Sequence, residues 1–276
     1  MKINLHTHTN FSDGSSYPEE YVREAIAQGF DTLGFSDHAP VPFPSTFAIR
    51  DDKLDEYVNT ILDLKKRYSS PQILLALEVD YIPGITKPFE EYRRSGQFDY
   101  LIGSVHLVKL DNSDILWFIC GRDISVYDNG LREIFHGDIR KAITSYFHQT
   151  NEMILTQKPD IIGHLDQIRM YNRDRYFNED DLWYVNLVDE TLEVIRYSGC
   201  LVEVNTRGMY KNRSDSLFPG PAILKKINQL NIPIILSSDA HKPDELSLGF
   251  DQARDLLQAI GFKMNHEWNF GCIEKV

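Results

Sequence analysis

A pair of histidines near the start of the chain is the first feature that could carry chemistry. His6 and His8 are separated by one threonine and lie at the end of a short apolar run. Residues two apart on a β-strand point to the same side, so both imidazoles can reach one metal ion. Taken alone, the pair is explained equally well as two polar residues at a strand end.

Other metal-ligating side chains follow later apolar runs in the same way. They are Asp37 with His38, then Glu78, His106, His164, and Asp239 with His241, while Asp13 lies in the loop just after the first pair. Side chains that bind ligands in parallel α/β folds gather at the carboxyl ends of the strands. A chance distribution would scatter them along helices and loops as well. The pattern therefore predicts a metal site with mixed histidine and carboxylate ligands. The remaining histidines, His136, His148 and His266, fall outside it, and we expect them to be solvated or packed.

Short β-rich runs that alternate with longer helical segments must position these residues. The strand candidates are 3–6, 32–36, 73–79, 100–106, 161–164, 201–205 and 232–237. The helix candidates are 18–28, 53–68, 87–95, 139–157, 180–197, 221–229 and 245–259. Strands that are each followed by a helix predict an α/β fold with a parallel sheet and right-handed crossovers. Because no Gly/Ser-rich linker and no repeat divides the chain, we expect one domain over residues 1–276.

The least regular stretch is 109–138, which contains Trp117 and Phe118. It follows the fourth strand candidate, so in an α/β barrel it would lie over the face where ligands bind. Long irregular loops in compact domains often cover a substrate. An insertion that packs on the barrel rim explains the stretch equally well.

The charge of the chain excludes some classes of partner. Its 276 residues include 29 Lys and Arg against 41 Asp and Glu, a formal net charge of −12. Nucleic-acid and anionic-membrane binding need a basic face, so neither partner is expected. A phosphate substrate would need local positive charge, and bound metal is the natural source. The three cysteines form no Cys-x-x-Cys pair, and no apolar run resembles a signal peptide or membrane span, which predicts a cytoplasmic protein.

Several motifs give the chain a family resemblance. His-Thr-His-Thr-x-Phe-Ser-Asp-Gly at 6–14 resembles the opening motif of the polymerase-and-histidinol-phosphatase superfamily. Segments that resemble its histidinol phosphatase branch lie at 102–106, 163–166, 202–206, 210–221, 236–241 and 248–251. The resemblance runs in order from residue 1 to about residue 262. It implies a distorted (β/α)7 TIM-like barrel with a trinuclear metal site at the C-terminal ends of the strands.

The resemblance also implies a ligand set for three divalent metal ions. The first ion would be held by His6, His8, Glu78 and Asp239, the second by Glu78 as a bridge with His106 and His164, and the third by Asp13, His38 and His241. Some superfamily members have a histidine where this chain has Asp13, and a carboxylate is an equally good hard ligand. Zinc is the expected metal, and manganese or iron would also suit mixed His/carboxylate ligands.

The implied activity is hydrolysis of L-histidinol phosphate to L-histidinol and phosphate, a step of histidine biosynthesis. The hypothesis is that hydroxide held between the first two metals, beside Glu78 and His106, attacks phosphorus while the third metal grips the phosphate. Arg207 and Arg169 are candidate phosphate ligands, because the guanidinium fork matches phosphate oxygens; Lys211 and Arg213 are weaker candidates. Asp37 or a metal-bound water would protonate the leaving oxygen. Trp117 or Phe118 would pack against the imidazole, and Glu203 and Asp166 are further candidates in the pocket.

Three alternative functions stay open on the sequence. A related phosphoesterase would act on another small monoester or on a nucleotide. A metal-stabilised domain without catalysis would be expected to have lost some ligands, yet every proposed position holds a competent side chain. An amidohydrolase-type barrel also opens with His-x-His, but it usually bridges its metals with a lysine, and no lysine ends a strand candidate here.

Overall fold

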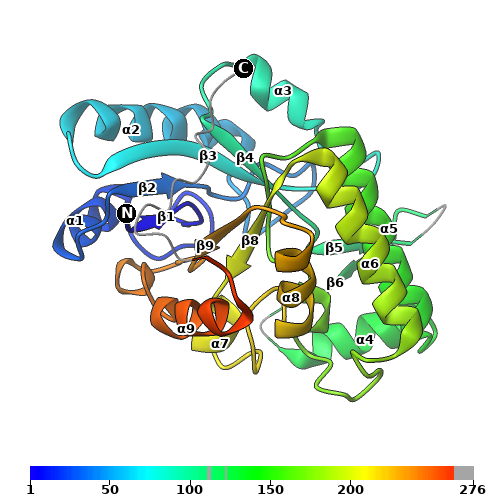
Figure 1. The fold of residues 1–276 in the computed structure, drawn as a ribbon. Coiled ribbons are helices and arrows are strands. Elements are labelled where there is room, and N and C mark those ends of the chain that lie inside the picture. The colour runs from blue at the N-terminus through cyan, green and yellow to red at the C-terminus, as the bar shows by residue number, and fades with distance from the viewer. Residues whose placement is uncertain (111–112, 122, 264–276) are drawn as a thin grey trace.

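The computed structural model describes residues 1–110, 113–121 and 123–263, and its main feature is a sheet of seven parallel strands (Figure 1). Their order in space is β1-β2-β3-β4-β7-β8-β9. The strands are β1 Ile3–Asn4, β2 Thr32–Phe35, β3 Gln72–Asp80, β4 Tyr100–Ser104, β7 Ile161–Ile162, β8 Leu201–Asn205 and β9 Ile234–Ser237. All seven predicted strands are present, and the parallel sheet is confirmed.

The segments that follow the first and last strands bring the sheet nearly to closure. Thr7 forms an isolated parallel bridge with Ala240. The amide of His8 donates to the carbonyl of Ala240 at 2.8 Å, and the Ala240 amide donates to the carbonyl of His6 at 3.2 Å. The result is a nearly closed barrel of seven parallel strands flanked by helices, which confirms the predicted distorted (β/α)7 class. The first histidine pair therefore lies on the seam of the barrel.

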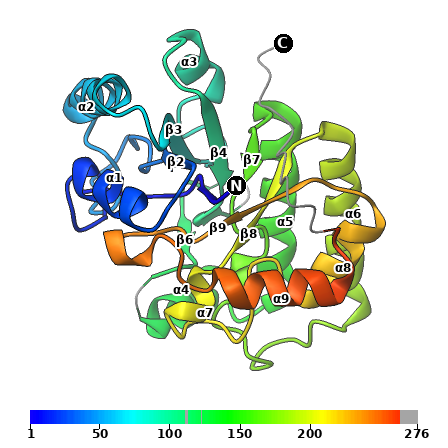
Figure 2. The ribbon, with the colours of Figure 1, turned by 60° about the vertical axis from the view of Figure 1, so that its left-hand side comes forward.

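Helices surround the strands on the outside of the barrel (Figures 1 and 2). They are α1 Pro18–Ala27, α2 Leu54–Arg67, α3 Phe89–Arg94, α5 Ile139–Gln157, α6 Leu182–Ser198, α8 Pro221–Gln229 and α9 Phe250–Ile260. Helix α2 shows how they pack: it buries Tyr57, Val58, Ile61 and Leu64, one stripe at helical spacing. The Tyr57 hydroxyl also donates to the Ala76 carbonyl at 2.8 Å, which ties the helix to β3.

One predicted helix begins later than expected. The segment predicted to be helical from residue 245 starts as a short 3-10 turn at Pro243–Glu245, and α9 begins only at Phe250. Gly249 adopts φ 80°, a left-handed conformation that cannot continue a right-handed helix. Helix α9 therefore begins only after this glycine.

The prediction that 109–138 is irregular is wrong. The chain forms an antiparallel hairpin of β5 Leu107–Lys109 and β6 Leu116–Phe118, followed by helix α4 Ile124–Ile134. Trp117 joins the two, because its indole nitrogen donates to the Tyr127 carbonyl at 3.0 Å and its ring lies where a side chain at Gly130 would stand. At 1% exposure, Trp117 belongs to the core, so the expectation that it contacts substrate is corrected. Phe118 is half-buried instead.

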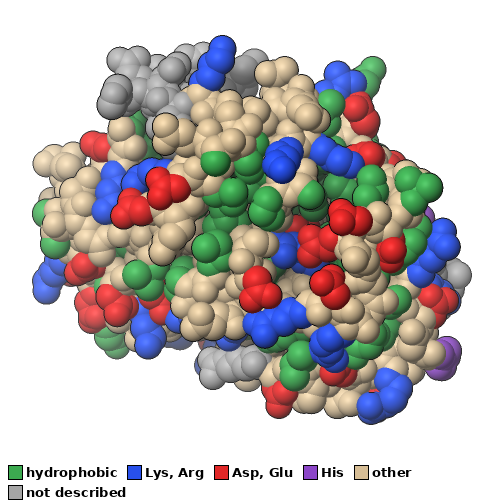
Figure 3. All heavy atoms as spheres, turned by 60° about the horizontal axis from the view of Figure 1, so that its bottom comes forward, with side chains coloured by type: hydrophobic (Ala, Val, Ile, Leu, Met, Phe, Trp, Pro, Cys, Tyr) green, Lys and Arg blue, Asp and Glu red, His purple; other side chains and the backbone are tan. Residues whose placement is uncertain are grey.

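Charged side chains of both signs are interspersed with hydrophobic ones on the face of the molecule shown in Figure 3. Within the described residues, no helix is both long and apolar enough to cross a membrane. His136 and His148 are exposed, as expected for histidines outside the site, while His266 and Cys272 lie outside the described residues.

Candidate metal centre

The predicted metal ligands converge at the carboxyl ends of the barrel strands. Their ligand atoms form four overlapping groups, each within 4.8 Å: His6, His8 and Asp239; His8, Asp13, His38 and His241; Glu78, His106 and His164; and His38, Asp80 and His106. The side chains of β3 and of the loops after β1, β2, β4, β7 and β9 all contribute. The structure thus gathers every residue that the resemblance implied as a ligand.

Glu78 lies at the centre of the cluster, with one carboxylate oxygen on each side. Its Oε2 is 3.2 Å from His6 Nε2, 3.4 Å from His8 Nε2 and 3.1 Å from His38 Nδ1. Its Oε1 is 2.9 Å from His164 Nε2 and 3.7 Å from His106 Nε2. Burial alone would raise the pKa of Glu78, but the surrounding imidazoles hold that pKa well below its usual range. The carboxylate is therefore ionised and faces two separate sets of histidines.

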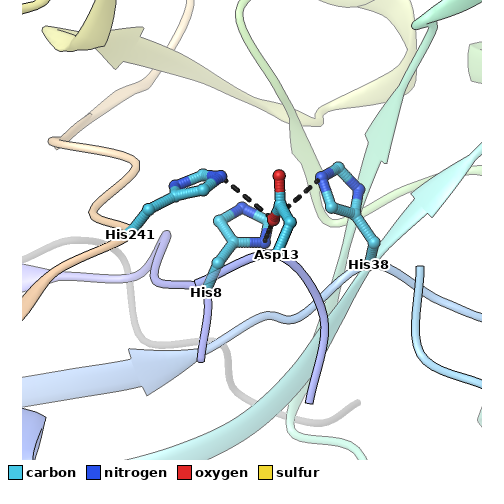
Figure 4. Close-up of side chains that lie close together, drawn as sticks. All are labelled: His8, Asp13, His38 and His241. Atoms are coloured by element: carbon cyan, nitrogen blue, oxygen red, sulfur yellow. Dashed lines mark ion pairs between the residues drawn. The ribbon is translucent and has the colours of Figure 1, made fainter. Parts of the chain in front are cut away.

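Asp13 forms a second focus, at the outer side of the cluster. Figure 4 shows the imidazoles of His8, His38 and His241 directed toward its carboxylate. The Oδ1 of Asp13 is 3.1 Å from His241 Nε2, 3.8 Å from His8 Nδ1 and 3.9 Å from His38 Nε2. His8 lies between the two foci, because its Nε2 faces Glu78 while its Nδ1 faces Asp13.

Two buried carboxylates hold the histidine rings from behind. Glu203 Oε1 lies 2.6 Å from His6 Nδ1, and Glu203 Oε2 accepts the backbone amide of His164 at 2.8 Å. Asp80 Oδ1 lies 2.6 Å from His106 Nδ1, and its Oδ2 is 3.5 Å from His38 Nδ1. Such partners fix the tautomer and orientation of ligating histidines. Sequence reasoning missed Asp80, although its position two residues after Glu78 on one strand places both side chains on the same face.

Several polar atoms of the cluster have no hydrogen-bond partner within the described part of the chain, although they are buried. They are His6 Nε2, both ring nitrogens of His8, His38 Nδ1, His164 Nδ1, Asp13 Oδ1, Asp80 Oδ2 and Asp239 Oδ1. Buried polar groups of native proteins are normally paired, and each exception needs an explanation. Cations held by these imidazoles and carboxylates would satisfy them, so the residues fit divalent metals with a preference for mixed nitrogen and oxygen ligands.

The carboxylate of Asp37, expected to be a proton donor, is hydrogen-bonded to the loop after β1. Its Oδ1 accepts from the amides of Thr9 at 2.7 Å and Ser12 at 3.2 Å, and from the Ser12 hydroxyl at 2.6 Å. Burial raises the pKa of Asp37 to about 6. These bonds fix the turn that carries Asp13 into the cluster. Because its oxygens are occupied by this turn, the structure assigns Asp37 to positioning the loop and does not place it against a substrate.

The two candidate phosphate-binding arginines differ in their surroundings. Arg207 lines the cavity beside the cluster, and its Nη1 is 2.7 Å from both the Asp239 carbonyl and His241 Nδ1. Arg169 is 7% exposed and is absent from the residues that line this cavity. Its Nε donates to Asp166 at 2.6 Å, and its Nη2 donates to the Leu217 carbonyl. The expectation that Arg169 grips phosphate is therefore corrected, because buried partners take up its donors.

The cavity itself lies between the ligand cluster and the hairpin–helix segment. Phe118, predicted to contact substrate, lines it together with Phe47 and Arg213. Lys211 and Lys242 line an adjoining cavity that shares Phe47, Phe118 and Arg213 with this one. Cys120 also borders the cavity, and burial raises the pKa of its thiol well above the usual range, which keeps it protonated. Phe47, from the loop after β2, was missed because nothing in the sequence shows which loop residues face inward.

Comparisons with known proteins give the family of the chain. The chain is 26% identical to the histidinol-phosphatase of Bacillus subtilis over 91% of this chain and 97% of that protein. It is also 26% identical to the histidinol-phosphatase of Lactococcus lactis over 95% and 92% of the two chains. A solved structure of histidinol phosphate phosphatase from Lactococcus lactis, complexed with zinc, L-histidinol and phosphate, shares the fold with a TM-score of 0.72, 23% identity and coverage of 95% and 94%. The family model described as the PHP domain matches residues 4–207, and the chain therefore belongs to the PHP domain family.

Proposed function

We propose that this protein is a metal-dependent phosphatase that hydrolyses L-histidinol phosphate to L-histidinol and inorganic phosphate. The observation that carries the proposal is Glu78, whose two oxygens face two separate sets of buried histidines at the mouth of the barrel. The relatives from Bacillus subtilis and Lactococcus lactis carry the name histidinol-phosphatase, and the Lactococcus lactis structure contains zinc, L-histidinol and phosphate.

We infer that the cluster holds three divalent cations, with zinc as the expected metal. His6, His8, Glu78 and Asp239 would hold the first, Glu78, His106 and His164 the second, and Asp13, His38 and His241 the third. Bound cations would supply a nucleophile at neutral pH, by lowering the pKa of water, and charge to stabilise the transferring phosphoryl group. The candidate groups share His8, His38 and His106. The bridging role of Glu78 is supported by its two oxygens, which lie 3.2 Å from His6 Nε2 and 2.9 Å from His164 Nε2.

The protein groups around the cavity would bind and orient the substrate. Arg207 is positively charged at the edge of the cluster, where a phosphate oxygen can replace its present carbonyl partner. Glu203 and Asp80 would keep the metal-facing nitrogens of His6 and His106 free of protons. Phe118 offers an apolar ring for the alcohol part of the substrate. The phosphate would thus face the metal ligands and Arg207, and the alcohol part would lie against Phe118.

The test is phosphate release from L-histidinol phosphate, measured beside a panel of other monoesters with the bound metals quantified in the same preparation. We expect selectivity for L-histidinol phosphate and about three metals per chain. Comparable turnover of another monoester would keep the metal chemistry and overturn the substrate. A fully metallated protein that released no phosphate from any monoester would overturn the catalytic proposal.

A variant of the central carboxylate tests the bridging role. Glu78→Gln keeps the shape of the side chain but removes the charge that faces both sets of histidines. We expect turnover and metal content to fall together, because the amide cannot serve two cations. Full activity with full metal occupancy in this variant would contradict the assignment of Glu78 as the bridge.

A further inference from the structure

The cavity beside the metal cluster has an apolar wall that the metal chemistry does not use. The rings of Phe47 and Phe118 lie nearly parallel, with centroids 6.1 Å apart and an angle of 12° between planes. Phe47 also meets the ligand His38 edge to face at 5.2 Å. Met170 and Phe218 also line the cavity. A group beyond the phosphate would therefore rest on hydrocarbon and aromatic surface.

Gln167 is an uncharged polar residue on this wall. It lines the cavity, is 7% exposed, and its amide oxygen is buried without a hydrogen-bond partner within the described residues. A buried acceptor without a donor costs about 1–3 kcal/mol. Rotation about the last side-chain bond exchanges the amide oxygen and nitrogen, so the group can present either atom. A donor on a molecule bound in the cavity would satisfy the amide oxygen of Gln167.

The backbone around Gln167 is fixed to the metal centre. The backbone N–H of Gln167 donates to the backbone carbonyl of the ligand His164 at 2.9 Å. The preceding residue, Asp166, accepts from Arg169 at 2.6 Å and from the Gly220 amide at 2.9 Å. This buried clamp holds the 3-10 turn Gln167–Arg169 against the barrel. The distance from the Gln167 side chain to the metal ligands is thereby set by the fold.

We propose that Gln167 is the specificity-determining residue that hydrogen-bonds the imidazole of the substrate, with the ring N–H donating to its amide oxygen. The proposal rests on the proposed function and deepens it. An amide carries no charge, so it suits a ring that is neutral above its ordinary pKa of about 6.5 better than an ammonium, which would require a buried counter-charge. The apolar wall formed by Phe47 and Phe118 would contact the same ring.

Product inhibition separates this role from the metal chemistry. Gln167→Met keeps the length of the side chain and removes the amide, and Gln252→Met on the exposed side of α9 is the matched control. We expect Gln167→Met to weaken inhibition by L-histidinol about tenfold and to lower kcat/KM for L-histidinol phosphate by a similar factor. Inhibition by inorganic phosphate and the metal content should match the wild type, because the amide contacts neither.

A second variant and a binding measurement make each outcome decisive. Gln167→Glu keeps an acceptor oxygen at the same distance, so it should bind L-histidinol at least as tightly as the wild type in calorimetry. Selective hydrolysis of L-histidinol phosphate by Gln167→Met at wild-type efficiency would overturn this inference and leave the proposed function intact. Equal loss of L-histidinol and phosphate inhibition would overturn it as well, since that pattern marks a disturbed metal site. A wild-type protein that neither hydrolyses L-histidinol phosphate nor binds L-histidinol would overturn both proposals.

Discussion

Replacing Glu203 by glutamine changes the hydrogen bonds behind the metal site and removes one buried negative charge. The carboxylate is fully buried and accepts on both oxygens. One oxygen faces His6 Nδ1 at 2.6 Å, and the other accepts from the His164 amide at 2.8 Å and from the Asn205 side chain at 3.1 Å. Glutamine has the same shape, but one of its two terminal groups is a donor. The variant therefore loses either the hydrogen bond that it now accepts from His6 or those that it accepts from His164 and Asn205.

The less costly arrangement alters the tautomer of His6. If the new NH2 group faced the His164 amide and Asn205, two donor–donor contacts would form in a buried site. If it faces His6 Nδ1 instead, the ring has to accept there and carry its proton on Nε2. That nitrogen lies 3.2 Å from Glu78 and belongs to the metal group with His8 and Asp239. A protonated nitrogen cannot bind a metal ion, so the tautomer change competes with metal binding.

The expected loss is tenfold to about a hundredfold in metal affinity and in kcat/KM, the range found for residues that orient metal-ligating histidines. In free energy this is about 1.4–2.7 kcal/mol. Metal titration in a chelator buffer gives the affinity, and phosphate release gives the activity. The exposed Glu190→Gln on α6 is the control. Wild-type affinity and activity in Glu203→Gln would refute the tautomer argument, and so would a loss of activity without any loss of metal affinity.

Three further results are expected. Asp80→Asn should lower metal affinity by a similar factor, because one carboxylate contacts ring nitrogens of both His106 and His38; an unchanged chelator titration would contradict this. Arg169→Met should lower the free energy of unfolding in denaturant titrations by about 3–5 kcal/mol, since it leaves the buried Asp166 without its counter-ion, and a change below 1 kcal/mol would rule the clamp out. Acidification from about pH 8 to about pH 5 should release metal, because protons compete for the imidazole nitrogens; metal content after dialysis that is independent of pH would exclude histidine ligation.

Much of the fold could be predicted because the local signals agree with the tertiary arrangement. Helices such as α5 and α8 have the predicted bounds, and β8 does as well. Buried parallel strands read as short apolar runs, and caps mark helix ends. The hairpin and α4 were missed because the contact that joins them leaves no periodic pattern in the sequence: Trp117 packs into the space left by Gly130 and its indole nitrogen donates to the Tyr127 carbonyl.

The chemical type of the site follows from the amino-acid sequence. Histidines and carboxylates at the ends of successive strand candidates, from His6 to His241, have to meet once the strands are parallel, because every carboxyl end then lies at the same end of the barrel. Which polar residues face the cavity, and which ones bind partners inside the protein, depends on the tertiary fold. Arg169 is paired within the core, Asp37 holds a turn, and Gln167 is left with an unmatched amide. These roles depend on side-chain partners brought together from distant parts of the chain, and hydrophobic periodicity carries no information about them.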